Sequence, residues 1–319
     1  MISIWIANLA DLAFGDPYGF PHPVRLIGLY ISAFEKIARR ICKDNKSLKL
    51  AGVFLTISTV FLSYMTVWAL LRAAYYIGGS LRLFVNAFIL YTCLAGRCLA
   101  KEASKIAASL KNNDINGSRK LLSYIVGRDT AHMNENDISR AVIETVSENA
   151  SDGIIAPLFY MFLGGAPLSM AYKAINTMDS MVGYKNEKYE FFGWASARLD
   201  DIANFIPSRL TSIFMICGAF VLGLDYKNSH RIVKRDCRNH LSPNSGYPEA
   251  AAAGALGIML GGANLYFGKL VVKPSIGDKL KDIDGEDIKK MISLMYAAWI
   301  ISLIVFSIFN SYFTGIILI

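Results

Sequence analysis

The sequence predicts an all-α, polytopic integral membrane protein with about four to six membrane-inserted helices and polar active-site loops. Hydrophobic residues make up 54% of its 319 residues and charged residues only 18%, against roughly 45–50% and about 25% in soluble domains. The apolar residues gather in uncharged windows. Two of these, Ala51–Leu71 and Met291–Ile319, reach the roughly 20 residues that cross a bilayer core. We expect one domain over residues 1–319, because no repeat or interdomain linker interrupts the chain.

Shorter or interrupted apolar windows accompany these two. Leu83–Gly96 follows the first long window after a segment that contains Gly78-Gly79, which predicts a membrane hairpin with a short outer turn. The remaining windows are Met1–Ala10, Gly153–Tyr172, Leu210–Leu224 and Ala250–Gly268. The window Ala250–Gly268 is rich in Gly and Ala, and such small residues let membrane helices approach closely.

The window Gly153–Tyr172 is uncharged but contains Pro157, Gly164-Gly165 and Pro167, which interrupt helices. Two structures fit it: a broken transmembrane helix, or a re-entrant segment that returns to the same membrane face. Irregular backbone at membrane depth is found only where protein or a cavity covers it. Both structures therefore predict a polar-lined cavity nearby.

The net charge of +8 does not predict a nucleic-acid partner. Basic residues lie in the loops between apolar windows, where the positive-inside rule places them, rather than on one soluble face with interleaved aromatics. The densest stretch, Ser32–Lys49, is expected to be a cytoplasmic loop beside anionic lipid head groups. The five cysteines include no CxxC pair, so neither a disulfide framework nor a zinc site is indicated.

The polar residues come in four dense blocks that border the apolar windows. The first block is a proline-rich turn that presents Asp16, His22 and Arg25; it is either a structured interfacial loop or part of a site. The second block contains the predicted amphipathic helix Ser139–Asn149, on which Arg140, Glu144 and Glu148 share the face opposite the apolar one. That face is either solvated or, with Asn149 and Asp152, holds Mg²⁺, which prefers oxygen ligands.

The third block is the most informative of the four. If Tyr172–Tyr189 begins as a helix, Lys173, Asn176 and Asp179 lie on neighbouring turns of one face. Asp200 and Asp201 follow and directly precede an apolar run, so these acids lie at membrane depth or at its edge. Ionisable residues are costly there and indicate function by default.

The fourth block surrounds Ser245, Gly246 and Pro248. Pro248 suits the first turn of a helix, and the free N–H groups of that turn would form an anion cradle with Ser245 and Gly246. The alternative is a well-capped loop. No P-loop motif is present, so any nucleotide site is of another type.

The four blocks together suit three kinds of protein. These are an enzyme acting on a phosphorylated substrate, a Mg²⁺-dependent membrane prenyltransferase, and a transporter with a polar pocket at broken helices.

Six motifs carry a resemblance that narrows this choice. In order they are GDPYGFPHPVRLIG, GRDT, RAVIETVSENASDGIIAPLFY, YKAINTMDSMVGYKNEKY, ARLDDIANFIPSRL and SPNSGYPEAAAAGALG. Together they resemble the adenosylcobinamide-phosphate synthase family of cobalamin biosynthesis, the CobD/CbiB membrane proteins. The resemblance covers Asp16 to about Gly277 and is looser in the C-terminal quarter.

The resemblance implies a ligase that forms an amide bond. The family joins adenosylcobyric acid, through its free propionate, to (R)-1-amino-2-propanol O-2-phosphate, and ATP with Mg²⁺ is assigned to the reaction. A carboxylate resists attack by amines and must be activated, for example as an acyl phosphate, whose formation Mg²⁺ and Lys or Arg side chains would stabilise. A corrinoid-binding transporter is the alternative. The resemblance leaves open an aminopropanol or ethanolamine derivative as the amine, and other corrinoid-pathway enzymes as partners.

The resemblance also implies roles for individual residues. The amine is expected to lose its proton to Glu144 or His22. Mg²⁺ is expected at Glu148, Asp152, Asp179, Asp200 and Asp201. Substrate and phosphate groups are expected at Asp16, Arg25, Arg128, Lys173, Asn176, Lys185, Lys188, Arg198, Ser245 and Gly246. Because ATP is cytoplasmic, we expect a multi-pass protein of the cell membrane whose four polar blocks face the cytoplasm, with a re-entrant or broken Gly153–Tyr172.

Overall fold

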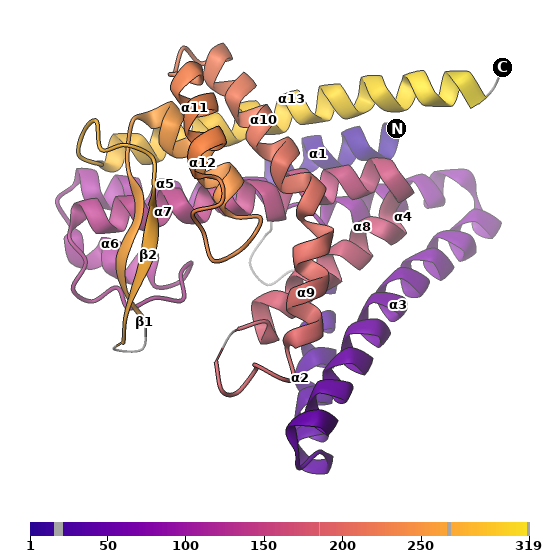
Figure 1. Ribbon diagram of the computed structural model, residues 1–319. Coiled ribbons are helices and arrows are strands. Elements are labelled where there is room, and N and C mark those ends of the chain that lie inside the picture. Colours follow the sequence, from indigo (N-terminus) through magenta and orange to yellow (C-terminus); the bar gives the residue numbers. More distant parts are fainter. Residues whose placement is uncertain (16–21, 185, 267–268, 318–319) are drawn as a thin grey trace. The chain divides into compact units, whose positions relative to one another are not determined.

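The computed structural model describes residues 1–15, 22–184, 186–266 and 269–317 (Figure 1). The regular elements of this part of the chain are helices apart from two paired β-strands, which confirms the predicted all-α class. The elements are α1 (Ile2–Phe14), α2 (Pro23–Ile41), α3 (Asn45–Ile77), α4 (Gly79–Tyr91), α5 (Gly96–Lys111), α6 (Ile115–Leu122), α7 (Glu135–Ala150), the π-helical turn η1 (Ser151–Ile155), α8 (Ala156–Val182), α9 (Trp194–Ala203), α10 (Phe205–Val221), α11 (Tyr226–Asp236), α12 (Gly246–Leu256), β1 (Leu260–Tyr266), β2 (Lys269–Ile276) and α13 (Gly285–Ile317).

Four helical stretches of the described chain are long and apolar enough to cross a membrane: Asn45–Ile77, Gly79–Lys111, Glu135–Val182 and Gly285–Tyr312. A fifth results if the broken pair α9 and α10 forms one span. These stretches contain three of the apolar windows and most of a fourth, Met291–Ile319, and their number lies within the predicted range. The chain is therefore a multi-pass membrane protein.

The chain forms two compact units. Residues 1–95 and 156–204 make the first unit, and residues 96–155 and 205–319 make the second. The expectation of a single domain stays a prediction. Each unit is described below by itself.

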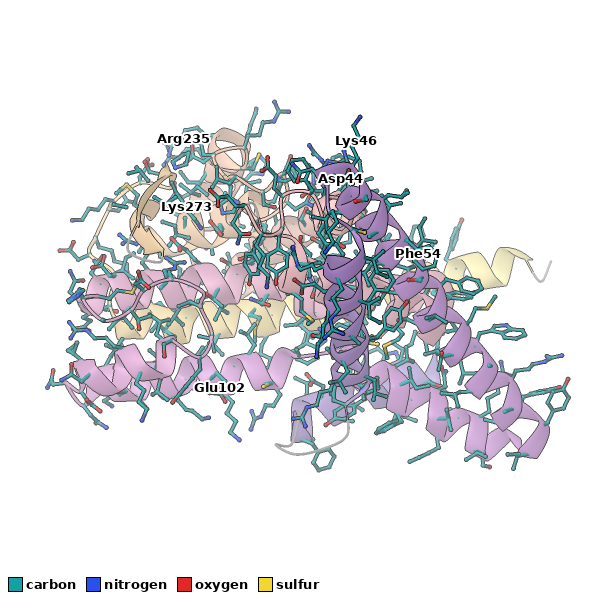
Figure 2. All side chains as sticks on the ribbon, turned by 90° about the horizontal axis from the view of Figure 1, so that it is seen from below. Asp44, Lys46, Phe54, Glu102, Arg235 and Lys273 are labelled. Carbon is teal, nitrogen blue, oxygen red and sulfur yellow. The ribbon has the colours of Figure 1, made fainter. Side chains whose placement is uncertain are left out.

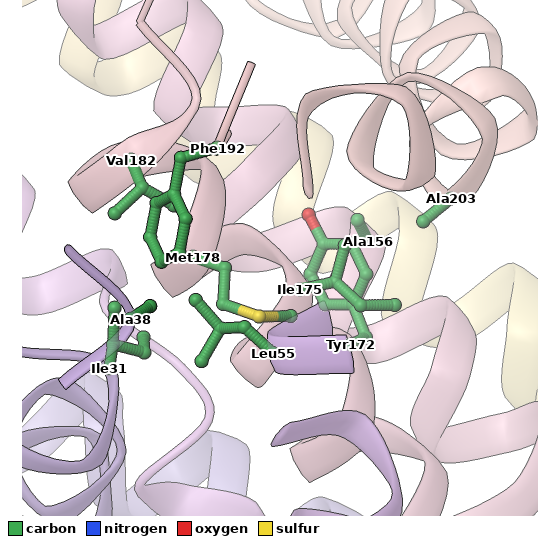
Figure 3. Packing of buried hydrophobic residues seen from close by; sticks show 10 residues of the cluster. All are labelled: Ile31, Ala38, Leu55, Ala156, Tyr172, Ile175, Met178, Val182, Phe192 and Ala203. Atoms are coloured by element: carbon green, nitrogen blue, oxygen red, sulfur yellow. The ribbon is translucent and has the colours of Figure 1, made fainter. Parts of the chain in front are cut away.

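The first unit is built on α3, which packs against α2, α4, α8 and α9. Its core joins Ile31 of α2 and Leu55 of α3 to Tyr172 and Met178 of α8 and to Phe192, which precedes α9 (Figure 3). All five side chains are almost fully buried. This packing holds the polar face of α8 in a fixed register beside α9.

The second unit is built on α13, which packs against α5, α7 and α10, while α12 packs against α7, α10 and α11. The strands β1 and β2 pair antiparallel, with Gly262 opposite Lys273. The helix α7 covers the predicted Ser139–Asn149 and begins earlier, because Asn134 and Asp137 form a capping box at its N-terminus. The pattern of apolar residues thus located this helix, and its cap set where it starts.

The structure confirms the interruption predicted in Gly153–Tyr172. Inside α8, Gly164 and Gly165 leave helical geometry, with φ of −151° and 67°. Pro167 lies just after this break, at the start of a helical segment, where a missing N–H costs nothing. Pro157 lies just after the π-helical turn η1. Whether the segment re-enters one membrane face stays a prediction.

Only the first part of the apolar window Ala250–Gly268 is helical. Here α12 ends at Leu256, because Gly257 adopts the left-handed conformation with φ 67° and ψ 38°. Gly261 and Gly262 follow with φ of 82° and 83°, which an α-helix does not accommodate. The close helix packing expected from small residues is found at Gly254 of α12, which lies against the backbone of α11.

Candidate functional site

The third polar block forms a cluster of acids and amides in the first unit, here called the aspartate cluster: Asn176, Asp179, Asp200, Asp201 and Asn204. The helix α8 is regular over its part of the block, so Lys173, Asn176 and Asp179 share a face as predicted. Asp200 on α9 is 9% exposed, and the side chains of Asn176, Asp179 and Asp201 are among those that interact with its carboxylate. Asp179 and Asp201, two further predicted metal ligands, are thus among the charges that act on Asp200.

Two tyrosines hold the aspartate cluster in place. The Tyr172 hydroxyl donates a hydrogen bond to Oδ1 of Asn204 at 2.8 Å, and Nδ2 of Asn204 donates to Oδ2 of Asp200 at 3.0 Å. The ring of Tyr172 stacks on Tyr160 at 4.9 Å between centroids, and the Tyr160 hydroxyl donates to the carbonyl of Ala203 at 2.9 Å. Because Tyr172 uses the Asn204 oxygen, the amide nitrogen must face Asp200.

One oxygen of Asp200 is left over. Its Oδ1 atom is buried and has no hydrogen-bond partner within the described chain, which is costly for a carboxylate. Carboxylate and amide oxygens are the donors that Mg²⁺ prefers, and Mg²⁺ is usually held by one or two carboxylates together with waters and substrate phosphates. The described residues contain no group of three His, Cys, Asp or Glu side chains able to hold a metal by themselves. The aspartate cluster thus offers the oxygen donors that Mg²⁺ takes, and its role as a magnesium site stays a prediction.

The predicted phosphate-binding residues of the first unit differ from one another in exposure and in polar partners. Lys173 is half-buried on the same face of α8 as the cluster. Nζ of Lys188 lies 2.7 Å from the Tyr189 hydroxyl and 3.4 Å from Oε1 of Glu35, and the bond to Tyr189 is the main cause that raises the pKa of Lys188. Arg198 is 68% exposed and lies 3.9 Å from Asp201. Lys185 lies outside the described residues.

In the first polar block, His22 and Arg25 are described and Asp16 is not. His22 is the N-cap of α2, and its Nδ1 accepts a hydrogen bond from the Val24 N–H at 3.2 Å. Arg25 lies exposed in the first turn of the same helix. Capping accounts for His22 next to a proline, and its role as a base stays a prediction.

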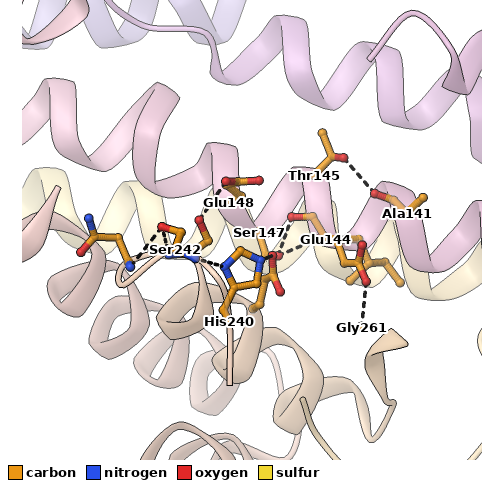
Figure 4. A network of polar contacts seen from close by, with 12 residues as sticks. Ala141, Glu144, Thr145, Ser147, Glu148, His240, Ser242 and Gly261 are labelled. Atoms are coloured by element: carbon orange, nitrogen blue, oxygen red, sulfur yellow. Dashed lines mark hydrogen bonds and ion pairs between the residues drawn. The ribbon is translucent and has the colours of Figure 1, made fainter. Parts of the chain in front are cut away.

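The second and fourth polar blocks meet in the second unit (Figure 4). They form a group that we call the glutamate–histidine cluster: Glu144 and Glu148 of α7, His240 and Ser245 before α12, and Glu249 of α12. Ser245 donates to Oε1 of Glu148 at 2.8 Å. Nε2 of His240 lies 3.7 Å from Oε1 of Glu249, and Glu144 is also among the charges that act on Glu249.

Glu144 is an ion-paired residue of this cluster. Its Oε2 lies 2.5 Å from Arg128, and its Oε1 accepts the backbone N–H of Gly261 at 2.9 Å. Both Arg128 and Glu144 are buried, so the interpretation of this helix face as solvated is wrong for Glu144. Both of its oxygens are engaged, and its predicted role as a base remains untested.

The predicted anion cradle at Ser245 and Gly246 already faces an anion of the protein itself. Glu148 accepts the Ser245 hydroxyl at the start of α12, where carboxylates are stabilised by the helix dipole. A Cβ on Gly246 would lie 2.4 Å from the carbonyl oxygen of Cys237, so the close packing of this loop explains the glycine. Asp152, the remaining predicted ligand, is half-buried in η1.

Several residues in and around the two clusters had been given no role from the sequence. Glu249 is only 2% exposed, and burial, followed by the charges of Glu144 and Glu148, raises its pKa well above the ordinary value. Burial is also the main cause that lowers the pKa of His240. Lys273 on β2, labelled in Figure 2, is among the charges that act on both residues. Tyr172, His240 and Glu249 belong to the polar blocks but no pattern singled them out, and Lys273 lies outside the blocks.

Arg209, a charged residue within the apolar helix α10, is held by two aromatic rings and two hydrogen-bond acceptors. Arg209 of α10 lies 3.6 Å from the ring centroid of Phe205 and 4.2 Å from that of Tyr247. It also donates to the carbonyl of Phe205 at 2.7 Å and to Oδ1 of Asn244 at 3.1 Å. Arg209 thus links α10 to the loop that carries Ser245.

Comparison with known proteins identifies the family. The family model described as "CobD/Cbib protein" matches residues 4–295. The chain belongs to the CobD/CbiB family. It is 50% identical over 292 residues to "Cobalamin biosynthesis protein CobD" of Geobacter metallireducens, covering 92% of this chain and 91% of the relative.

Other relatives give the same result. The CobD/CbiB chain is 51% identical to "Cobalamin biosynthesis protein CobD" of Clostridium perfringens, over 91% of each protein. It is 47% identical to "Cobalamin biosynthesis protein CbiB" of Salmonella arizonae, over 98% of each. No solved structure matches. The resemblance read from the six motifs is therefore confirmed at the level of the family, and the finer assignments are proposals.

Proposed function

We propose that this CobD/CbiB protein is a membrane ligase of cobalamin biosynthesis that joins adenosylcobyric acid to (R)-1-amino-2-propanol O-2-phosphate, consuming ATP. In the first step, a propionate oxygen of the corrinoid attacks the γ-phosphorus of ATP, and ADP leaves. In the second step, the amine nitrogen attacks the acyl carbon, phosphate leaves, and the nitrogen loses a proton. The product is adenosylcobinamide phosphate.

The observation that carries this proposal is the unpaired Oδ1 of Asp200 beside Asp179 and Asp201. Mg²⁺ bound there would neutralise charge on the phosphates during transfer. Asn204, fixed by Tyr172, holds the other Asp200 oxygen and so keeps Oδ1 turned toward the ligand. Lys173, on the same face of α8, is placed to contact a phosphate oxygen. This donor set favours phosphoryl transfer over simple corrinoid binding, the activity expected of a transporter.

The test is mass spectrometry on purified, detergent-solubilised protein supplied with adenosylcobyric acid, the amine phosphate and Mg-ATP. We expect an amide product from the wild type and a loss of about 10²-fold or more in Asp200→Asn and Asp179→Asn, since electrostatic stabilisation of a transition state is worth this much. Asp282→Asn is the matched control, because Asp282 is exposed and lies in the second unit. Chelation of Mg²⁺ by EDTA should also stop product formation.

Two results would contradict the proposal. Full activity of Asp200→Asn would remove Asp200 from the site. A folded wild-type protein that makes no amide but moves corrinoid into vesicles would establish the transporter instead.

A further inference from the structure

The glutamate–histidine cluster contains more carboxyl groups than basic groups. Its three carboxyl groups are Glu144, Glu148 and Glu249, and the cations near it are Arg128 and Lys273. Arg128 is already paired with Glu144. A ligand with a small cationic group would supply a partner for the carboxyl groups that have no basic residue of their own.

His240 supplies a second and independent observation. Its side chain is 10% exposed, and its Nδ1 accepts the Ser242 N–H at 3.0 Å. In the neutral imidazole, which the lowered pKa favours, the proton must therefore lie on Nε2. That Nε2 atom is buried without a hydrogen-bond partner in the described chain, and its 3.7 Å distance to Glu249 exceeds a hydrogen bond. An acceptor atom of a ligand would satisfy it.

The members of the cluster differ in exposure. Glu144 and Glu249 are buried, whereas Glu148, His240 and Lys273 are half-buried. Lys273 is among the charges that act on Glu249, and Nε2 of His240 lies 3.7 Å from Oε1 of Glu249. Two groups that suit an anion, the His240 N–H and the Lys273 ammonium, therefore accompany carboxyl groups that suit a cation.

We propose that the glutamate–histidine cluster binds the amine substrate, a short aminoalkyl phosphate ester. The ammonium group is placed against Glu249 and Glu148, and the phosphate against Lys273 and the Nε2–H of His240. A primary ammonium has three donors and suits two carboxylates, while a phosphate suits Lys and an N–H group. This inference rests on the proposed ligation, and it names the residues that select one of the two substrates.

Isothermal titration of the full-length, detergent-solubilised protein, without ATP or corrinoid, tests this site with three probes. They are (R)-1-amino-2-propanol O-2-phosphate, its deamino analogue 1,2-propanediol 2-phosphate, and its dephospho analogue 1-amino-2-propanol. Glu249→Gln should weaken both amine-bearing probes at least about tenfold and leave the deamino analogue unchanged. Lys273→Ala should weaken both phosphate-bearing probes and leave 1-amino-2-propanol unchanged. Glu286→Gln, which removes an exposed carboxylate of the same unit, should match the wild type.

The pattern across probes separates a lost contact from a damaged fold, because a misfolded variant would lose all three ligands alike. Unchanged affinity of Glu249→Gln for the amine phosphate overturns the inference, as does a wild type that binds none of the probes. Failure of the ligation is recognised separately. A wild type that binds the amine phosphate through Glu249 but forms no amide leaves the site standing and removes the reaction.

Discussion

Arg128 and Glu144 form a buried ion pair on which the polar interior of the second unit depends. Their side chains are 6% and 4% exposed, so each charge has lost most of its hydration. Such a pair contributes little net stability compared with apolar residues, but removal of one partner leaves the other charge uncompensated. Sequence analysis placed Glu144 on the correct helix but not with this partner, because Arg128 lies sixteen residues earlier in a segment without helical pattern.

Arg128→Met should therefore destabilise the protein strongly. The unpaired carboxylate of Glu144 should cost about 3–5 kcal/mol, a fall in Tm of roughly ten degrees. Thermal unfolding of the detergent-solubilised protein measures it. Arg198→Met, at an exposed arginine, should leave Tm unchanged, and Glu144→Gln added to Arg128→Met should recover part of the loss. An unaltered Tm in Arg128→Met would show that water or lipid head groups reach Glu144.

At the scale of elements, the small residues of α12 bring α11 and α12 into close contact. A Cβ on Gly254 would lie 2.6 Å from the Cα of Ser229 and 2.7 Å from the carbonyl oxygen of Asn228. Ser229 and Asn228 donate from their side chains to the backbone carbonyls of Ala251 and Gly254, each at 2.8 Å. The helix that carries Glu249 is thus fixed by backbone-to-backbone packing.

Gly254→Ala should disturb this contact and, through it, the position of Glu249. The two helices would have to separate, since the atoms in the way are backbone atoms, and overpacking of this kind costs about 1–3 kcal/mol. We expect a lower Tm and weaker binding of the amine phosphate. Gly127→Ala is the control, because a Cβ there meets nothing within 4 Å. Equal Tm values for the two variants would contradict the close packing.

Helices were predicted correctly from the sequence where a repeating pattern of apolar residues determines them. Helix ends and strands were missed where the φ angle of a single glycine determines the structure. The long uncharged windows located α3 and α13, and helical spacing located α7. The end of α12 at Gly257 and the hairpin beyond it depend on glycines with positive φ, which the sequence does not distinguish from glycines used for helix packing. The aspartate cluster was predicted because Asp179 and Asp200 belong to dense polar runs, whereas Glu249 stands alone before an alanine-rich stretch.

At the scale of the whole molecule, the predicted orientation in the membrane can be tested by cysteine labelling. We expect the third polar block to face the cytoplasm, where ATP is found. In a variant without the native cysteines, Ser180→Cys places a thiol at an exposed position of this block. It should resist a membrane-impermeant maleimide in intact cells and react after permeabilisation. Gly79→Cys, in the predicted outer turn, should react in intact cells, and labelling of Ser180→Cys there would reverse the orientation.

The interleaved order of the two units has a consequence for how the protein is made. Residues 96–155 belong to the second unit, but their partners are residues 205–319, and the chain completes the first unit in between. At about 5–20 residues per second of synthesis, the carboxylate of Glu144 waits on the order of ten seconds for the backbone of Gly261 that it will bind. Until residues 205–319 are made, residues 96–155 therefore expose surface that the finished unit buries, and incomplete intermediates of this kind are prone to aggregate.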